Sequence, residues 1–225
     1  MLGTWFYVFV WALLWACRRT WWRWHISGQD NLRPRGQAMV LAVNHLHWSD
    51  TYVLGASLPV SLRPTWMAKA ELFANPIAAW WLRAIQVIPV HRGHHGQRAL
   101  VAAEEALKKG SALVIFVEGH RSPTGGLQAG QGGAVRLAAR TGCPIVPIAV
   151  WGTEAGFRSA WARKPIHVCI GEPYYVVTET PRIPKQRMNE LVDEMMLRLA
   201  ALMPEAYQGT YRERIALMPR DSSQT

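Results

Sequence analysis

Short apolar runs alternate with amphipathic segments along most of this chain, and this alternation restricts its fold more than any other feature. The runs expected to form buried strands are Met39–Val43, Thr65–Ala68, Gln86–Val90, Ala112–Val117, Ile145–Val150 and Ile166–Ile170. The segments with helical spacing are Glu71–Arg83, Gln97–Lys109, Gly132–Arg140 and Pro184–Met203. Alternation of this kind predicts an α/β fold, with a mixed, largely parallel sheet flanked by helices.

The length of the chain bounds the number of domains. It has 225 residues, 50% of them hydrophobic, which suits one domain with a sizeable core. No internal repeat, low-complexity stretch or linker marks a second domain. We therefore expect an N-terminal segment over residues 1–24, a single domain over 25–219 and a frayed tail over 220–225.

The N-terminal segment has the composition of a membrane-surface helix. Residues 1–17 carry no charged side chain, and Arg18, Arg19 and Arg23 follow at once. Six of the 12 tryptophans also lie here, namely Trp5, Trp11, Trp15, Trp21, Trp22 and Trp24. Aromatic rings mixed with arginine beside an apolar run suit the headgroup layer, where the rings are buried and their polar edges stay wet. We expect residues 1–24 to form a membrane anchor or interfacial helix.

Two membrane placements are open for this helix. Its apolar part would extend about 25 Å, less than the ~30 Å hydrocarbon core, so it either spans with a tilt or lies in one leaflet. The arginines lie on the domain side, which by the positive-inside rule predicts the cytoplasmic face of the cell membrane. A signal peptide is disfavoured because no positive charge precedes Cys17, and a buried core helix is the remaining alternative.

The charge balance favours anionic partners. The formal net charge is +10, which attracts the phosphates of nucleic acids, anionic lipids or small metabolites. Nucleic acid is not an expected partner, because no recognised motif appears and no basic stripe interleaves with aromatic residues. The three cysteines lack metal-like spacing, and the histidine-rich stretch 91–95 matches no standard zinc pattern, so we expect no metal site and no disulfide framework.

Polar clusters follow three of the predicted strands. Asn44 and His45 follow the first strand, His91 and Arg92 follow the third, and residues 118–122 follow the fourth. In α/β sheets, ligands collect in the crevice at the carboxyl ends of the strands. The clusters are therefore expected to form one shared site.

The sequence NHLHWSD places His45 five residues before Asp50. On a regular helix their side chains would point about 140° apart, so they can pair only if His45 lies in a turn and Asp50 in the first turn of the next helix. Asp50 would then fix the tautomer of His45, which could take a proton from a hydroxyl. The alternative is a surface histidine and an ordinary helix N-terminal aspartate. His47 as a competing base and Ser49 as a nucleophile served by His45 are further alternatives.

Two arginines could hold an anion beside that pair. Arg92 and Arg121 each follow a predicted buried strand, and the planar guanidinium group binds phosphate through two parallel hydrogen bonds. At neighbouring strand ends they would form a phosphate clamp. The alternative is that both are solvated arginines on a basic protein.

Four blocks in this order resemble the glycerolipid acyltransferases, whose best-known members are the 1-acyl-sn-glycerol-3-phosphate acyltransferases. NHLHWSD resembles the family's NHxxxxD signature, and the stretches 87–92, 116–122 and 145–148 resemble its second, third and fourth blocks. The late stretches 171–173 and 202–209 also look like family features. The resemblance covers nearly the whole chain after the N-terminal segment.

The resemblance implies roles for individual residues. It makes His45 the general base on the acceptor hydroxyl and Asp50 the residue that orients it. The residues that it assigns to acceptor binding are Arg92, Glu118, Gly119 and Arg121. It implies an α/β fold tethered at the membrane, direct attack of the acceptor oxygen on the thioester, and no cofactor beyond the co-substrate, acyl-CoA or acyl-acyl carrier protein.

Some positions depart from the family pattern. Val117 and His120 replace the usual Pro and Thr of the third block, and Gly130-Gln131-Gly132 stand where the family often carries Phe-Lys. The expected activity is acyl transfer to the sn-2 hydroxyl of lysophosphatidic acid, giving phosphatidic acid in phospholipid biosynthesis. Because the missing lysine would remove a cation, another lysolipid acceptor is the nearest alternative, followed by a non-catalytic lipid-binding protein and a thioesterase.

Overall fold

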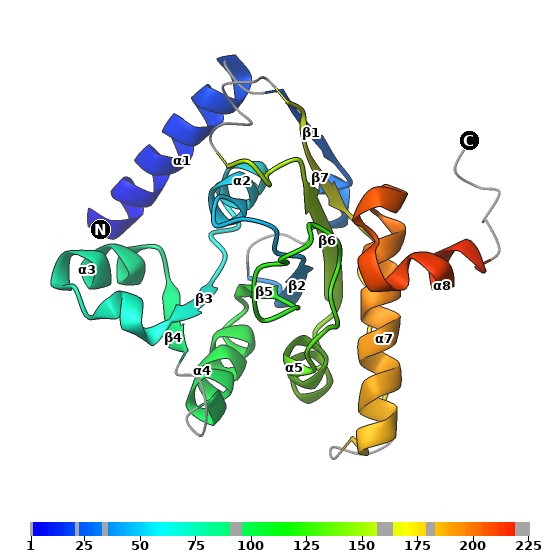
Figure 1. Ribbon diagram of the computed structural model, residues 1–225. Helices are drawn as coiled ribbons and strands as arrows, with labels where there is room; N and C mark the ends of the chain where they lie inside the picture. Colours follow the sequence, from blue (N-terminus) through cyan, green and yellow to red (C-terminus); the bar gives the residue numbers. More distant parts are fainter. Residues whose placement is uncertain are drawn as a thin grey trace.

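A five-stranded mixed sheet in the order β1-β7-β6-β2-β5 forms the centre of the molecule (Figure 1). The computed structural model describes residues 2–20, 23–32, 36–90, 96–156, 164–178 and 183–218. The strands are β1 (Trp24–Ser27), β2 (Met39–Val43), β5 (Ala112–Phe116), β6 (Ile145–Trp151) and β7 (Ile166–Ile170). β2 runs parallel to β5 and β6, β1 runs parallel to β7, and β6 and β7 are antiparallel. The predicted α/β fold with a mixed, largely parallel sheet is confirmed.

A second, two-stranded parallel sheet continues the first beyond β5. It consists of β3 (Trp66–Lys69) and β4 (Val87–Val90). An isolated parallel bridge between Thr65 and Leu113 joins β3 to β5. Because β2, β3, β4, β5 and β6 all run in the same direction, their carboxyl ends lie along one edge, called the carboxyl edge below.

Helices cover both faces of the central sheet. Along β2, Val40 and Ala42 pack toward α5 (Gly133–Thr141) and α7 (Lys185–Ala201). Met39, Leu41 and Val43 pack on the opposite face, toward α2 (Asp50–Ser57). All five residues of β2 are buried, which explains why its sequence is continuously apolar rather than alternating.

The remaining elements surround this core. They are α1 (Leu2–Thr20), η1 (Gln29–Asn31), η2 (Ala70–Phe73), α3 (Pro76–Ala84), α4 (Gly96–Lys108), η3 (Glu205–Tyr207), η4 (Gly209–Tyr211) and α8 (Arg212–Ala216). Three of the four predicted helices are confirmed as α4, α5 and α7, and all six predicted strands are present, with bounds that differ by at most two residues. The tail predicted to be frayed, residues 220–225, lies outside the described residues.

Two sequence predictions of secondary structure were wrong. The helix predicted over Glu71–Arg83 is divided into η2 and α3, because Asn75 caps a new helix: its side-chain oxygen accepts from the N–H groups of Ile77 and Ala78. Pro76, at the first helical position, suits such a start. Strand β1 was missed: Trp24 was assigned to the N-terminal segment, and residues 25–27 to the start of the domain without a strand.

The N-terminal helix α1 lies against α2 and α3 (Figure 1). Its Trp11 donates an indole hydrogen bond to the carbonyl of Leu58 at 3.1 Å, and the guanidinium of Arg63 lies 5.3 Å from the ring centroid of Tyr7. Side chains on its outer face are exposed, among them Trp5 and Phe9. Among the described residues, no helix is both long and apolar enough to cross a membrane.

Candidate active site

The predicted polar clusters meet at the carboxyl edge where β2 and β5 end side by side. β2 ends at Val43 and is followed by Asn44 and His45, whereas β5 ends at Phe116 and is followed by Val117 and Glu118. The N–H of Val117 donates to the carbonyl of Val43 at 2.9 Å, so the ladder between the two strands continues to the edge. The cluster His91-Arg92 lies outside the described residues.

His45 and Asp50 form the predicted pair. Nδ1 of His45 lies 2.8 Å from Oδ2 of Asp50. His45 follows the strand in a turn, and Asp50 is the first residue of α2, where a carboxylate also suits the helix dipole. With its proton on Nδ1, His45 donates to Asp50 and leaves Nε2 able to accept a proton.

The carboxylate of Asp50 is fully buried and accepts further hydrogen bonds from the loop. Oδ2 also accepts from the backbone N–H groups of Leu46 at 2.7 Å and His47 at 2.8 Å. Oδ1 accepts from the hydroxyl of Thr153 at 2.6 Å. Four donors on one carboxylate therefore fix both the path of the loop and the orientation of the imidazole.

The imidazole of His45 is confined on a second side. Its ring stacks on Phe116, with centroids 4.0 Å apart and planes 20° apart. The side chain is 17% exposed, so part of the ring can still meet a ligand. Beneath it, Asn44 accepts from the N–H of Val150 at 2.7 Å and donates to its carbonyl at 2.8 Å. That side-chain bridge ties the turn to β6.

Glu118 lies behind the loop with both of its oxygens occupied. Oε1 accepts from the backbone N–H of His45 and Oε2 from that of Gln128, each at 2.8 Å. The side chain is fully buried, and burial raises the pKa of its carboxyl although both hydrogen bonds act to lower it. The resemblance assigned Glu118 to substrate binding, whereas this geometry favours a role in positioning His45.

The exposed end of the same loop carries Gly119, His120 and Arg121. Gly119 has φ +73°, a left-handed conformation that favours glycine, and its N–H donates to the carbonyl of Phe116 at 3.0 Å. The N–H of Ser122 donates to the carbonyl of His45 at 2.7 Å, which ties the backbone next to Arg121 to the His45 turn. Arg121 is exposed and forms no ion pair within the described parts of the chain.

Sequence reasoning missed a further cation, Lys69. It is the last residue of β3, it is exposed, and it is in register with Val90 at the end of β4. Its side chain therefore belongs to the same carboxyl edge as the His45 turn. The available signal was its position directly after the predicted strand Thr65–Ala68, where a polar residue is a site candidate.

Within the described residues, neither the His47 ring nor the Ser49 hydroxyl is hydrogen-bonded to His45. Nδ1 of His47 lies 2.9 Å from the hydroxyl oxygen of Ser49. Ser49 is buried and bonds to His47, so the predicted alternative of a serine served by His45 is not the arrangement seen here. The His47 ring packs closely on Gly156, where an added Cβ would come within 2.4 Å of it.

The positioning role of Glu118 can be tested by Glu118→Gln. An amide has one acceptor oxygen, so its NH₂ group would face a backbone N–H of His45 or Gln128. We expect the free energy of unfolding to fall by about 1–3 kcal/mol, measured by urea denaturation. The control Glu190→Gln, on the exposed face of α7, should change it by less than about 0.5 kcal/mol. Equal effects of the two changes would contradict this role.

The chain is similar in sequence to several known acyltransferases. The 1-acyl-sn-glycerol-3-phosphate acyltransferase BAT2 of Brassica napus is 31% identical over 156 residues, which cover 67% of this chain and 44% of the relative. That of Pseudomonas aeruginosa is 28% identical over 188 residues, covering 80% and 71%. The lyso-ornithine lipid O-acyltransferase of the same bacterium is 31% identical over 126 residues, covering 56% and 46%. The chain thus spans less than half the length of two of these relatives.

A solved structure shares the fold. The crystal structure of the 1-acyl-sn-glycerophosphate acyltransferase PlsC from Thermotoga maritima superposes with a TM-score of 0.63 at 22% identity, over 84% of this chain and 77% of that one. Residues 23–151, more than half of the chain, match the model of the Acyltransferase family. This stretch contains the His45–Asp50 pair, the Glu118 loop and Lys69, and the chain belongs to the acyltransferase family.

Proposed function

We propose that this protein transfers a fatty acyl group from acyl-CoA or acyl-acyl carrier protein to the sn-2 hydroxyl of lysophosphatidic acid, forming phosphatidic acid. The observation that carries the proposal is the His45–Asp50 pair, in which Nδ1 is engaged and the ring remains partly exposed. The similarity to acyltransferases that are named for 1-acyl-sn-glycerol-3-phosphate supports this acceptor.

The pair supplies the proton transfer that this reaction needs. Nε2 of His45 accepts the proton of the lipid hydroxyl while the hydroxyl oxygen attacks the thioester carbonyl. Asp50 stabilises the imidazolium that forms, since it already accepts the Nδ1 hydrogen bond. The C–S bond then breaks, the new ester forms, and the leaving thiolate takes the proton from Nε2. No acyl-enzyme intermediate is required.

The phosphate of the acceptor would lie among the cations of the carboxyl edge. Arg121 is exposed on the loop that is bonded to His45, and Lys69 ends β3 on the same edge. Arg92 remains a predicted third ligand, two residues beyond the end of β4. Guanidinium and ammonium groups at neighbouring strand ends form a site that favours a phosphomonoester over a neutral headgroup.

A different lysolipid acceptor is the second candidate. The chain is also similar to a lyso-ornithine lipid O-acyltransferase, and residues 130–132 lack the lysine that the family often has there. An assay that compares lysophosphatidic acid with lyso-ornithine lipid and lysophosphatidylcholine separates the two candidates. The first predicts the highest kcat/KM with lysophosphatidic acid.

The reaction and its base are tested by thiol release from acyl-CoA or acyl-acyl carrier protein, with and without lysophosphatidic acid. The wild-type protein should release thiol only with the acceptor and form phosphatidic acid. His45→Ala and Asp50→Asn should each lower this turnover by about 10²- to 10⁴-fold. Asp50→Asn should leave the thermal midpoint nearly unchanged, since its amide oxygen can accept the three loop donors while its NH₂ group donates to Thr153.

Other outcomes of this assay favour the remaining alternatives. Thiol release that is independent of any acceptor would indicate a thioesterase. Lysolipid binding that survives His45→Ala, without thiol release by the folded wild-type protein from either donor, would indicate a non-catalytic lipid-binding protein. Both results would contradict the proposed reaction.

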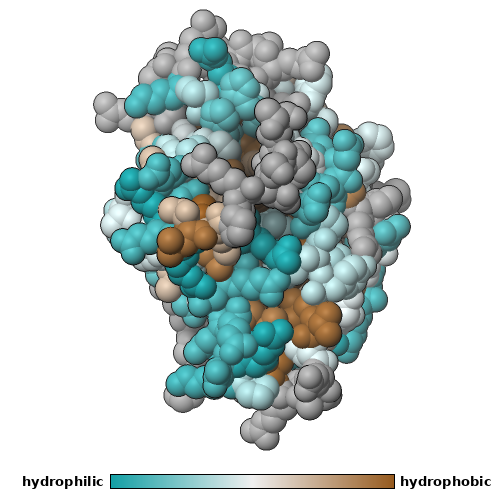
Figure 2. Space-filling view, turned by 90° about the vertical axis from the view of Figure 1, so that its right-hand side faces the viewer, coloured by the Kyte–Doolittle hydropathy of each residue, from teal (hydrophilic) through white to brown (hydrophobic). Residues whose placement is uncertain are grey.

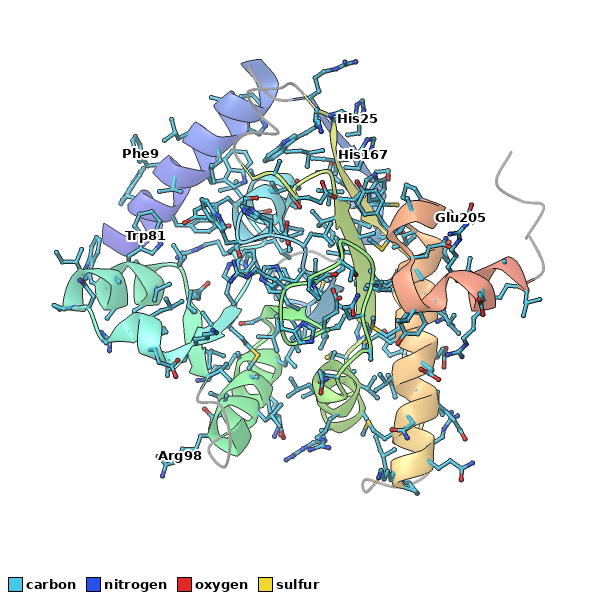
Figure 3. The ribbon with its side chains drawn as sticks, viewed as in Figure 1. Phe9, His25, Trp81, Arg98, His167 and Glu205 are labelled. Atoms are coloured by element: carbon cyan, nitrogen blue, oxygen red, sulfur yellow. The ribbon has the colours of Figure 1, made fainter. Side chains whose placement is uncertain are left out.

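The protein is further proposed to lie on the membrane surface through α1 and α3, at the cytoplasmic face. Large apolar side chains are exposed on both helices and on the adjoining η2: Trp5, Phe9, Leu13, Leu72, Ile77 and Trp80. Figure 3 shows Phe9 on the outer side of α1, away from the sheet. The face carried by α7 and α8, on the opposite side of the molecule, is largely hydrophilic (Figure 2). An exposed aromatic face on one side of a molecule and a hydrophilic face on the other are typical of an interfacial protein.

This orientation predicts which surface residues control vesicle binding. The double change Trp5→Glu and Phe9→Glu should weaken binding to phosphatidylglycerol vesicles at least tenfold, because two large apolar side chains no longer enter the interface. Val101→Glu is the matched control, since Val101 is exposed on α4 away from this face. Equal loss of sedimentation with vesicles for both variants would contradict the orientation.

A further inference from the structure

A hollow lies at the carboxyl edge, at the opposite end of the central sheet from β5. Its volume is about 300 Å³, and it is lined by Trp24, His25, Ile26, Ser27, Trp151, His167 and Val168. None of these residues takes part in the His45 site described above. The hollow is formed by β1, β7 and the end of β6 and is separate from the His45 site.

Planar rings form a stack along one wall of this hollow. His25 stacks on His167 with centroids 4.8 Å apart and planes 19° apart. His167 stacks in turn on Trp151 at 4.8 Å with planes 1° apart, and Tyr207 of η3 lies beyond Trp151 at 6.4 Å. Figure 3 shows the labelled His25 and His167 as neighbours on adjacent strands.

Strand pairing fixes this stack in place. His25 is in register with His167, and His167 is in register with Trp151, so the three rings follow one row across β1, β7 and β6. Burial lowers the pKa of His167, and the neighbouring His25 adds to that shift, so the central ring is uncharged at neutral pH. His25, the outermost ring, lies on the edge strand β1 and is exposed.

Two cations lie at the same end of these strands. Arg23 immediately precedes β1, and Lys164 lies two residues before β7. The N–H of Ile166 donates to the carbonyl of Arg23 at 2.9 Å, which holds the two strand starts together. Both side chains are exposed, and neither forms an ion pair with a carboxylate of the described residues. An aromatic platform with two unpaired cations suits a purine that carries phosphate groups.

The sheet sets the distance between the row of stacked rings and His45. Asn44, next to His45, bonds with both backbone groups of Val150, and Trp151 follows Val150 directly. From β2 to β1 there are three interstrand spacings of about 4.8 Å, so the row of rings ends about 14 Å from the His45 strand. The pantetheine arm of CoA has as many backbone bonds as four residues and extends about 14 Å.

We propose that this hollow binds the adenosine 3′,5′-bisphosphate portion of acyl-CoA, with the purine on His25 and the phosphates beside Arg23 and Lys164. The inference rests on the proposed acyl transfer and names its donor. The pantetheine arm would pass over the carboxyl edge by Trp151 and place the thioester near His45. Acyl carrier protein presents the same arm without the nucleotide and therefore makes no use of this hollow.

Two acyl donors, one with and one without the nucleotide, separate the contribution of the nucleotide to kcat/KM from that of the acyl arm. Steady-state kcat/KM is measured with palmitoyl-CoA and with palmitoyl-pantetheine, for the wild-type protein, His25→Ala and Arg23→Ala. We expect each change to lower kcat/KM for palmitoyl-CoA about tenfold and to leave that for palmitoyl-pantetheine unchanged. Arg187→Ala, which removes an exposed cation from α7, is the control and should alter neither value.

A direct binding measurement tests the nucleotide site independently of the proposed reaction. Adenosine 3′,5′-bisphosphate is titrated calorimetrically into the His45→Ala protein and into the same protein with His25→Ala. Binding that is lost with His25 supports the nucleotide site, even if no donor is turned over and the proposed acyl transfer fails. Acceptor-dependent activity without any nucleotide binding, or an equal loss with both palmitoyl donors in His25→Ala, would overturn the nucleotide site and leave the proposed reaction standing.

Discussion

The carboxylate of Asp50 is the centre on which the rest of the site depends. It is fully buried and accepts hydrogen bonds from the His45 ring, from two loop N–H groups and from Thr153 beyond β6. A buried carboxylate that lost these donors would carry a large desolvation cost, so the loop and its partner are fixed together. The same contacts that stabilise the turn also orient the imidazole.

A second carboxylate supports this arrangement from behind. Glu118 bridges the backbone of His45 to that of Gln128. The residue before Gln128, Leu127, is tied in turn to the C-terminal part of the chain. The N–H of Leu127 donates to the carbonyl of Tyr207 at 2.9 Å, and Gly209 approaches Leu127 so closely that an added Cβ would lie 2.1 Å from its carbonyl oxygen. The segment 205–211 therefore holds Leu127, and with it the loop that follows Glu118, in place.

Much of this architecture could be predicted from the sequence because its signals are local. Continuous apolar runs predicted the buried strands, and the five-residue spacing of His45 and Asp50 allowed the two to pair only across a turn followed by a helix start, which is the arrangement seen. The contacts that escaped prediction join residues far apart in the chain. Asp50 meets Thr153 across 103 positions, and Asn44 meets Val150 across 106. No local pattern could indicate that both carboxylate oxygens of Glu118 would accept hydrogen bonds from backbone N–H groups.

An acceptor that lacks the attacking hydroxyl distinguishes direct transfer from transfer through an acylated protein. If His45 activates the lipid hydroxyl for direct attack, 2-deoxy-lysophosphatidic acid should inhibit competitively and support no thiol release. No acylated protein should then be detected by mass spectrometry after mixing with acyl-CoA or acyl-acyl carrier protein alone. Release of one equivalent of thiol with formation of an acylated protein, in the absence of any lipid hydroxyl, would contradict direct transfer.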